Sequence, residues 1–247
     1  MTPSIQEGLE EIRRRHGADS VLRVERMLLG KRSDRHPLQK QAKWILPGLT
    51  SKPWHDPREH EVLRPIVEGL EKLHPEIKAE FLQTSKAGAL VDYGHYKGVQ
   101  DDWKALYLFR KGQEVDAAAQ YVPQTFRFMK EQIADWLCPL LEMHFSTLLP
   151  GARVAPHCDL WNFTINLHLA VDIPSDCVLR VANVDHCWEE GRCLLFDYSY
   201  LHEAWNAGDR ARTCLLVDLW NPEVTLAERE ALVLVVQELR RLTGEHV

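Results

Sequence analysis

The sequence predicts a mainly β fold with flanking helices, in which a sandwich or barrel of jelly-roll type forms the core. Apolar residues recur with helical spacing before about residue 138 and with strand spacing after it. The strand candidates of the second half are separated by short turn-like stretches, as in jelly rolls. The 247 residues are 45% hydrophobic and 27% charged, which excludes a disordered chain, a collagen-like fibre and a simple coiled coil.

Residues 1–45 are predicted to form a helical extension and a linker. Thr2 is a suitable N-cap, Pro3 suits the first helical position, and Gly17 can end the first helix. A second apolar helical face follows and ends near Gly30. The segment 31–43 contains five basic residues and one acid, which indicates a solvated linker or a docking site for an acidic partner.

Residues 46–247 are predicted to form the main domain, with the jelly-roll core at about 103–222. A loop rich in Pro and Gly comes first, and a helix over about 58–73 follows it. The segment 75–102 shows no clear pattern. The next elements expected are a strand at 103–109 and a helix at about 122–136.

Five strand candidates and a closing helix complete the chain. The candidates alternate in polarity and are rich in β-branched and aromatic residues. They are residues 140–149, 163–173, 177–183, 193–200 and 211–220. The helix over 225–244 begins with Thr225 and has Glu228 three residues on, which is the pattern of a capping box.

Charge and cysteine content restrict the expected partners and compartment. The chain has 30 Lys and Arg against 36 Asp and Glu, a net charge of −6. Nucleic-acid and membrane-surface binders are more often basic, so we expect neither kind of partner. Six cysteines without a C-x-x-C pair indicate a reducing compartment, the cytoplasm. We expect no signal peptide and no transmembrane helix, because no apolar run is long enough. The sequence leaves the oligomeric state open.

One constellation in the β-rich half indicates a metal site. His157 and Asp159 are two residues apart, so on an extended strand both side chains point to the same face. His202 from a distant strand can complete a two-histidine, one-carboxylate set, which suits non-haem Fe(II) because it leaves coordination positions open. The alternative is that these are ordinary polar residues at a strand end.

Longer motifs surround these residues. The segments HFSTLLPGARVAPHCD, NLHLAVDIP, CWEEGRCLLFDYSYLHEAWN and ARTCLLVDLWNPEVTLAERE follow one another in this order. Together they resemble the catalytic domain of the aspartyl/asparaginyl β-hydroxylase family of 2-oxoglutarate-dependent oxygenases. The likeness runs over about 140–232 and is weaker at 46–54 and 101–109. It implies a double-stranded β-helix core, of the cupin-like jelly-roll type.

The resemblance also implies cofactors and roles for named residues. His157 and His202 match the iron-binding histidines, and Asp159 would complete the metal site. Arg212 matches the arginine that grips the distal carboxylate of 2-oxoglutarate, Ser146 matches a serine that shares this carboxylate, and His168 matches a histidine near the other end of the co-substrate. The implied activity is hydroxylation of an unactivated C–H bond with Fe(II), 2-oxoglutarate and O2, releasing succinate and CO2.

Two departures from the family pattern concern the ligand set and the substrate. The best-known members have glycine where this chain has Asp159. They also carry two arginines, which grip carboxylates of substrate and co-substrate, where this chain has Thr164 and Asn166; neither replacement can supply a charged bidentate grip. We therefore expect a different substrate: a free amino acid, a small peptide or a biosynthetic intermediate. The residues expected to line its pocket are Tyr107, Trp161, Asn162, Thr164 and Asn166.

Several alternatives remain open from the sequence. A lipid A-type acyl-chain hydroxylase shares the H-x-D pattern but would be expected to carry a membrane-anchoring segment. A non-catalytic jelly-roll binding protein and a zinc hydrolase are the other classes; Arg212 and Ser146 argue against a hydrolase, which needs no buried carboxylate grip. Desaturation and epoxidation are further outcomes of the same chemistry.

Overall fold

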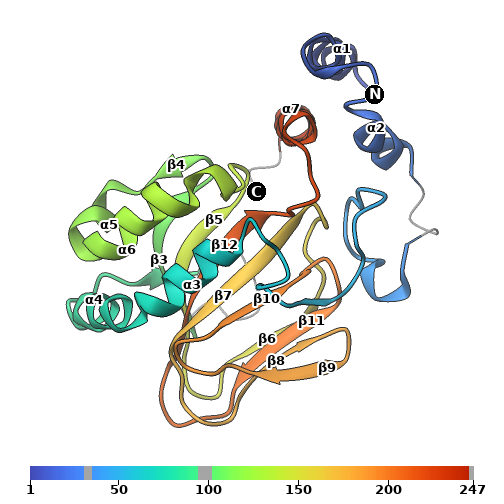
Figure 1. Ribbon diagram of the computed structural model, residues 1–247. Helices are drawn as coiled ribbons and strands as arrows, with labels where there is room; N and C mark the ends of the chain where they lie inside the picture. Colours follow the sequence, from blue (N-terminus) through green and yellow to red (C-terminus); the bar gives the residue numbers. More distant parts are fainter. Residues whose placement is uncertain (31–34, 94–101, 245–247) are drawn as a thin grey trace.

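Two antiparallel β-sheets face one another in a computed structural model that describes residues 1–30, 35–93 and 102–244 (Figure 1). The larger sheet has the strand order β1-β10-β7-β12-β5-β3-β2, with β4 beside β3. Its strands are β1 (Trp54–His55), β2 (Val91–Asp92), β3 (Trp103–Arg110), β4 (Gln113–Glu114), β5 (Glu142–Leu148), β7 (Thr164–Asp172), β10 (Cys193–Phe196) and β12 (Arg212–Trp220). The smaller sheet, in the order β6-β11-β8-β9, is built from β6 (Arg153–His157), β8 (Cys177–Val181), β9 (Val184–Cys187) and β11 (His202–Asn206). The predicted jelly-roll fold is confirmed.

Strict alternation along the central strands gives the larger sheet two different faces. Phe145, Leu167 and Val217 point to the outer face, where they join one apolar cluster with residues of the covering helices. On each of these strands, the residues at the alternate positions point inward, toward the smaller sheet, because successive side chains of a strand alternate between faces. Each fully buried Leu, Val or Phe on the outer face contributes about 1.5–3 kcal/mol. Packing of the helices on the outer face therefore stabilises the larger sheet, and its inner face can carry polar side chains.

The helices α3 (Arg64–Lys72), α4 (His74–Lys86), α5 (Asp116–Tyr121) and α6 (Pro123–Phe128) cover the outer face (Figure 1). The helix expected over 58–73 starts only at Arg64. Turns occupy the residues before it, and the side chain of Asp56 accepts a hydrogen bond from the Arg58 N–H. The expectation that this whole segment is helical was wrong at its beginning, because local side-chain bonding competes with helix formation there.

The segments around α6 depart from the predictions in two ways. The helix expected at 122–136 is present but irregular, since α6 continues as a π-helix (Met129–Ile133) and a short 3-10 turn (Ala134–Trp136). The unpatterned segment 75–102 contains most of α4, and its residues 94–101 lie outside the described ranges. The Pro75 ring is placed in the first turn of α4, where a missing N–H costs nothing.

Three strands of the smaller sheet were not predicted. β6 lies in a stretch interpreted as a turn, β9 follows a tight turn directly after β8, and β11 follows the predicted strand 193–200, which itself ends at Phe196. The strand β6 is five residues long, and three of them are exposed. A short, exposed edge strand has little apolar patterning by which a sequence can reveal it.

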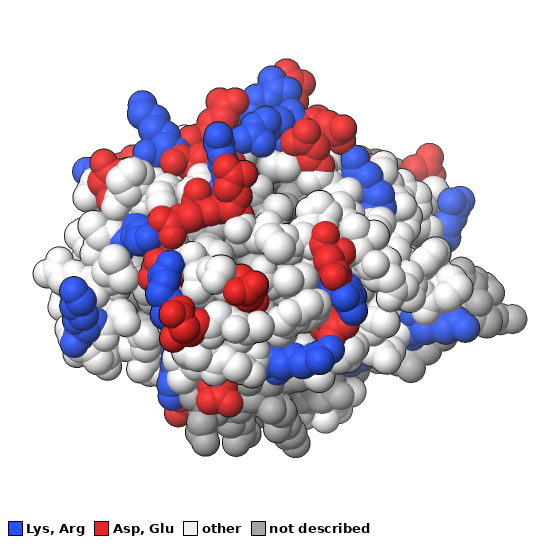
Figure 2. Space-filling view, turned by 90° about the horizontal axis from the view of Figure 1, so that it is seen from below, with Lys and Arg blue, Asp and Glu red and all other residues white. Residues whose placement is uncertain are grey.

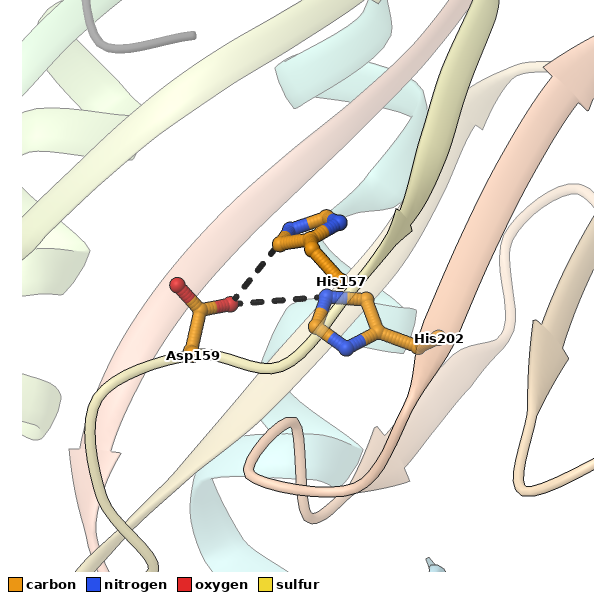
Figure 3. A group of neighbouring side chains, drawn as sticks. All are labelled: His157, Asp159 and His202. Atoms are coloured by element: carbon orange, nitrogen blue, oxygen red, sulfur yellow. Dashed lines mark ion pairs between the residues drawn. The ribbon is translucent and has the colours of Figure 1, made fainter. Parts of the chain in front are cut away.

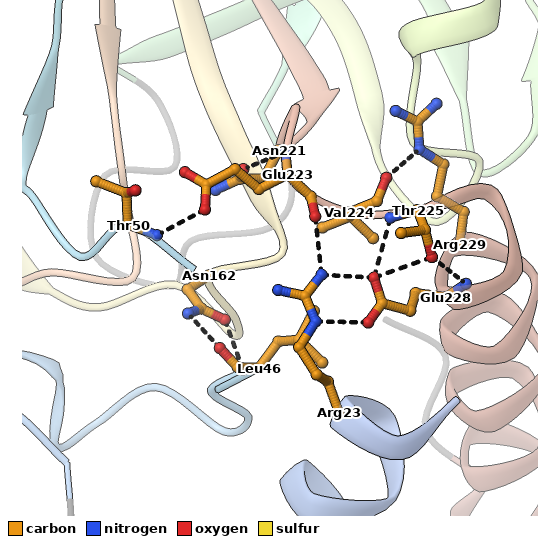
Figure 4. A network of polar contacts seen from close by, with 10 residues as sticks. All are labelled: Arg23, Leu46, Thr50, Asn162, Asn221, Glu223, Val224, Thr225, Glu228 and Arg229. Carbon is orange, nitrogen blue, oxygen red and sulfur yellow. Dashed lines mark hydrogen bonds and ion pairs between the residues drawn. The ribbon is translucent and has the colours of Figure 1, made fainter. Parts of the chain in front are cut away.

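The N-terminal helices α1 (Pro3–His16) and α2 (Leu22–Leu29) pack against the C-terminal helix α7 (Leu226–Thr243). The predicted cap at Thr2 and the capping box of Thr225 and Glu228 are both present. Arg23 on α2 donates two hydrogen bonds of 2.6 Å to the buried Glu228 carboxylate (Figure 4). The same carboxylate thus caps α7 and ties it to α2.

The basic segment 31–43 is not a solvated linker in its described part. The Leu38 carbonyl accepts a hydrogen bond of 2.6 Å from the Leu201 N–H and a weaker one of 3.4 Å from the Cys158 thiol. Gln39 is buried and donates to the Ser199 hydroxyl at 2.9 Å. The Leu38 carbonyl and the Gln39 side chain of this segment therefore bind the loops next to the candidate metal ligands.

Candidate active site

The structure brings the three predicted metal ligands together (Figure 3). His157 ends β6 and His202 begins β11, and the two are register partners across this strand pair. Asp159 lies in the loop after β6 rather than on the strand, where its N–H donates to the Tyr198 carbonyl at 2.9 Å. One ligand atom from each side chain lies within 4.8 Å of the others.

Hydrogen bonds orient both imidazoles toward the carboxylate. The Nδ1 atom of His157 lies 2.8 Å from the Ala155 carbonyl, and that of His202 lies 2.9 Å from the Tyr200 carbonyl. A carbonyl only accepts, so each Nδ1 carries the proton and each neutral ring presents an Nε2 lone pair. These Nε2 atoms are 3.9 Å and 3.4 Å from Oδ2 of Asp159. Backbone carbonyls are common partners for metal-binding histidines.

The electrostatics of the three groups suit a divalent cation. Burial, reinforced by the charge that His202 carries when protonated, lowers the pKa of His157 and so favours its neutral ring. Burial alone would raise the pKa of Asp159, but the hydrogen bond and the positive charge that His202 offers when its ring is protonated outweigh burial and hold that pKa below its usual value. When both rings are neutral, two imidazoles and one carboxylate on one side of a point form the facial set that leaves other coordination positions open.

A cavity of about 400 Å³ lies between the sheets, next to these ligands. Five further residues selected from the sequence are among those lining it: Ser146, Trp161, Asn166, His168 and Arg212. The volume is within the usual range for small-molecule sites. The ligands and the predicted co-substrate residues therefore share one space.

Arg212 presents unused hydrogen-bond donors at this cavity. It begins β12, is 3% exposed, and packs its guanidinium against the Trp188 ring at 4.5 Å from the ring centroid. Its Nε and Nη1 atoms are buried and have no hydrogen-bond partner among the described residues. A buried charge without partners is costly. A ligand carboxylate, which a guanidinium binds through two parallel hydrogen bonds, would satisfy both atoms.

His168 adds a third unused donor. Trp188 donates to its Nδ1 atom at 3.3 Å, so the ring proton lies on Nε2, which is buried and has no partner in the described part of the chain. Burial and the Arg212 charge hold the pKa of His168 well below its usual value. Ser146 accepts a hydrogen bond of 2.8 Å from the Trp103 indole, which leaves its own hydroxyl proton to donate. The donors of these residues together match an anionic ligand.

The remaining residues predicted for the substrate pocket lie elsewhere. Asn162 bonds through its side chain to the backbone N–H and carbonyl of Leu46, at 2.7 Å and 3.1 Å, and so fixes the loop after the linker (Figure 4). Thr164 is fully buried between Trp161 and Tyr198, with hydrogen bonds of 2.9 Å and 2.6 Å. Tyr107 packs against the His144 ring, with ring centroids 5.2 Å apart. None of the three lines the cavity.

The family model for aspartyl/asparaginyl β-hydroxylases matches residues 71–222. The chain belongs to the aspartyl/asparaginyl β-hydroxylase family. It is 31% identical over 188 residues to the aspartyl/asparaginyl β-hydroxylase of Mus musculus, which covers 75% of this chain and 25% of that protein. It is 32% identical over 216 residues to the aspartate β-hydroxylase domain-containing protein 2 of Xenopus tropicalis, covering 81% of this chain and 55% of that protein.

This β-hydroxylase-family chain thus spans about a quarter of one relative and about half of the other. Among solved structures, a prolyl hydroxylase from Trichoplax adhaerens, in complex with a peptide fragment of hypoxia inducible factor, aligns with 13% identity and a TM-score of 0.41 over 66% of this chain and 81% of that one. No helix within the described ranges is long and apolar enough to cross a membrane.

Two cavity residues of this β-hydroxylase-family chain were missed from the sequence. Asp218 lies on β12, six residues after Arg212, so strand periodicity already places both on one face. Glu142 begins β5 and lies two residues before His144 on the same face. Trp188 was not selected from the sequence as a site residue, and it is the residue against which Arg212 and His168 both pack.

Proposed function

We propose that this chain is an Fe(II)/2-oxoglutarate-dependent dioxygenase that hydroxylates an unactivated C–H bond of a small amino-acid, peptide or biosynthetic-intermediate substrate. The observation that carries the proposal is the set of unused donors of Arg212 and His168 in the cavity that also holds the metal ligands. A zinc hydrolase has no need of such a set. Family membership supports the same activity.

One group of cavity residues is proposed to bind the metal, and a second group is proposed to bind the co-substrate carboxylate. His157, Asp159 and His202 would hold Fe(II), which, with bound 2-oxoglutarate and O2, supplies the oxidising power for hydroxylation and yields succinate and CO2. Arg212 would bind the distal carboxylate of 2-oxoglutarate through two hydrogen bonds, and the Ser146 hydroxyl would donate to the same group. Trp188 fixes the guanidinium, because the ring covers one of its faces.

His168 acts as a neutral donor in this scheme. Burial and the Arg212 charge hold its pKa well below the usual value, which favours the neutral ring and disfavours a second positive charge beside Arg212. The Nε2–H group would donate to a co-substrate oxygen, while Trp188 fixes the tautomer from the other side. The buried position of both donors excludes water that would otherwise compete for the carboxylate.

The proposed partners are small molecules or peptides rather than nucleic acid or membrane. Figure 2 shows acidic and basic side chains interspersed over one face of the molecule, without a continuous patch of either sign among the described residues of that face. All six cysteines are free thiols, which supports a reducing compartment, the cytoplasm, as the place of action.

The direct test is iron-dependent turnover of the co-substrate. Protein purified without oxygen is given Fe(II), 2-oxoglutarate and then O2, alone and with pools of amino acids and short peptides, and succinate is measured. We expect formation that requires iron, is stimulated by one pool, and falls at least tenfold in Arg212→Ala. Absence of both succinate formation and 2-oxoglutarate binding would favour a non-catalytic binding protein.

A further inference from the structure

The inner wall of the larger sheet carries a carboxylate that lacks a cationic partner. Asp218 on β12 accepts a hydrogen bond of 2.8 Å from the Asn166 side chain, its register partner on β7, and one of 3.1 Å from the Glu142 backbone N–H. Both donors are neutral amides. Asp218 lines the cavity and forms no ion pair with any residue of the described ranges.

The neighbouring charges do not neutralise Asp218. Glu142 is bound to Arg110, whose Nε lies 3.0 Å from its Oε1, so that arginine already has an acidic partner. Arg240 and Lys111 also border the cavity. The Arg240 guanidinium reaches the Leu140 carbonyl, and Lys111 is exposed to solvent. The Arg212 donors lie at the end of β12 opposite to Asp218, which is six residues along the strand.

Burial and the charge of Glu142 raise the pKa of Asp218 to about 7, so the carboxylate would be stabilised by a cation brought to it.

We propose that Asp218 binds a positively charged nitrogen of the substrate, an ammonium or guanidinium group, so that the substrate class is a basic amino acid, or a peptide that contains one. This inference rests on the proposed function and adds the charge of the substrate to it. Asn166 and Glu142 position the carboxylate, and Asp218 makes the contact. In this arrangement Arg212 binds the anionic co-substrate and Asp218 the cationic substrate, at two ends of one strand.

Binding of matched charged and neutral ligands tests the proposal without turnover. Protein loaded with Fe(II) and 2-oxoglutarate under nitrogen is titrated calorimetrically with L-lysine and L-norleucine, L-arginine and L-citrulline, and their Nα-acetyl forms, with L-aspartate as the acidic member. We expect the cationic member of at least one pair to bind about ten- to hundredfold more tightly, as for a charged hydrogen bond. Asp218→Asn, which keeps the size and one acceptor, should remove this preference.

Two further variants keep the outcome interpretable. Asp185→Asn makes the same chemical change on β9, in an exposed pair with Arg180, and should bind all ligands as the wild type does. Asn166→Arg places a cation beside Asp218 from within the chain, so it should abolish the preference for cationic ligands even if Asp218→Asn fails to fold.

Three outcomes would overturn the assignment: unchanged selectivity in a folded Asp218→Asn variant, tighter binding of aspartate than of lysine or arginine, or no binding of any cationic member. 2-Oxoglutarate affinity is measured in a separate titration of the Fe(II)-loaded protein. If the wild type does not bind 2-oxoglutarate, the proposed function itself is contradicted, whereas 2-oxoglutarate binding without cation selectivity contradicts the substrate class alone.

Discussion

His157 and His202 face one another across the antiparallel pair of β6 and β11, with their ring centroids 4.2 Å apart. Each is held by a carbonyl two residues before it in sequence. The two ligands therefore share one local geometry although 44 residues separate them in the numbering. Because the pair exists only when both strands are paired, metal binding and the folding of the smaller sheet are coupled.

Replacing Asp159 by alanine should weaken Fe(II) binding at least tenfold. The change removes the only negative charge of the proposed ligand set, and changes even at residues that merely support metal ligands typically cost 10–100-fold in affinity. Iron retained after anaerobic dialysis measures the effect. Asp185→Ala, at an exposed aspartate of β9 that pairs with Arg180, is the matched control and should retain iron as the wild type does. Equal iron retention in Asp159→Ala and wild type would show that the carboxylate is not a ligand.

Arg212→Lys should raise the dissociation constant for 2-oxoglutarate at least tenfold although the charge is kept. Lysine cannot form the paired hydrogen bonds of a guanidinium, and it loses the stacking on Trp188. Calorimetric titration with 2-oxoglutarate measures this. Arg210→Lys, at an exposed arginine bound to Asp172, should leave the affinity unchanged. If both variants bind equally well, Arg212 does not hold the carboxylate.

Stability should fall as the pH rises from about 4 to 7 because of Asp197. This carboxyl is 2% exposed, and burial raises its pKa to about 7 despite hydrogen bonds from Ser199. The unfolded chain loses this proton near pH 3.9, so the folded state binds more protons between the two values and stability declines with pH there. Above pH 7 the contribution is constant.

Asp197→Asn isolates this effect, because an amide oxygen still accepts from Ser199. Relative to wild type, the variant should gain stability over that pH range, on the order of 3 kcal/mol. Urea unfolding of metal-free protein at pH 4.5, 6 and 7.5 measures the difference, with Asp185→Asn as control. A difference that does not change with pH would mean that Asp197 ionises normally in the fold.

Glu228→Gln should destabilise the protein by about 1–2 kcal/mol, because Arg23 loses its buried partner while glutamine keeps the capping box. Glu230→Gln is the matched control two residues further along α7, where the carboxylate is 40% exposed and pairs with Arg15; its cost should be below about 1 kcal/mol. Urea unfolding gives both values. Equal losses in the two variants would contradict a special role for the buried pair.

The sequence predicted the strands of the larger sheet better than those of the smaller one. β5, β7 and β12 have apolar residues at every second position because helices cover one face. β11 contains His202, Glu203 and Asn206, all buried for reasons of bonding rather than hydrophobicity, so a pattern of apolar residues cannot reveal it. β6 is short and exposed. Such short strands are defined by their pairing with neighbouring strands, and the pattern of apolar residues in a single sequence does not show that pairing.

The candidate site was predictable where the family resemblance names individual residues. Ser146, His168 and Arg212 all line the cavity, as the family resemblance implied. Asn162 and Thr164 were expected to line the substrate pocket, yet their partners, Leu46 and Tyr198, lie more than 30 positions away in the sequence and bind them outside the cavity. Asp218 was missed because its significance depends on Asn166, which lies opposite it on another strand and carries no charge.

Position parity separates chemistry from stability in the three central strands. Ser146 in β5, Asn166 and His168 in β7, and Arg212 and Asp218 in β12 all carry even numbers and reach the cavity, whereas odd-numbered neighbours such as Phe145, Leu167 and Val217 pack on the helices. A combinatorial library restricted to these five cavity-lining positions would therefore vary ligand preference while leaving the packing on the helices intact. Deleting a single residue within β7 would instead disrupt the scaffold, because the following side chains would change faces. The His168 imidazole and the Asn166 amide would then point into the apolar layer under the helices, and the cavity wall would lose their hydrogen-bonding groups.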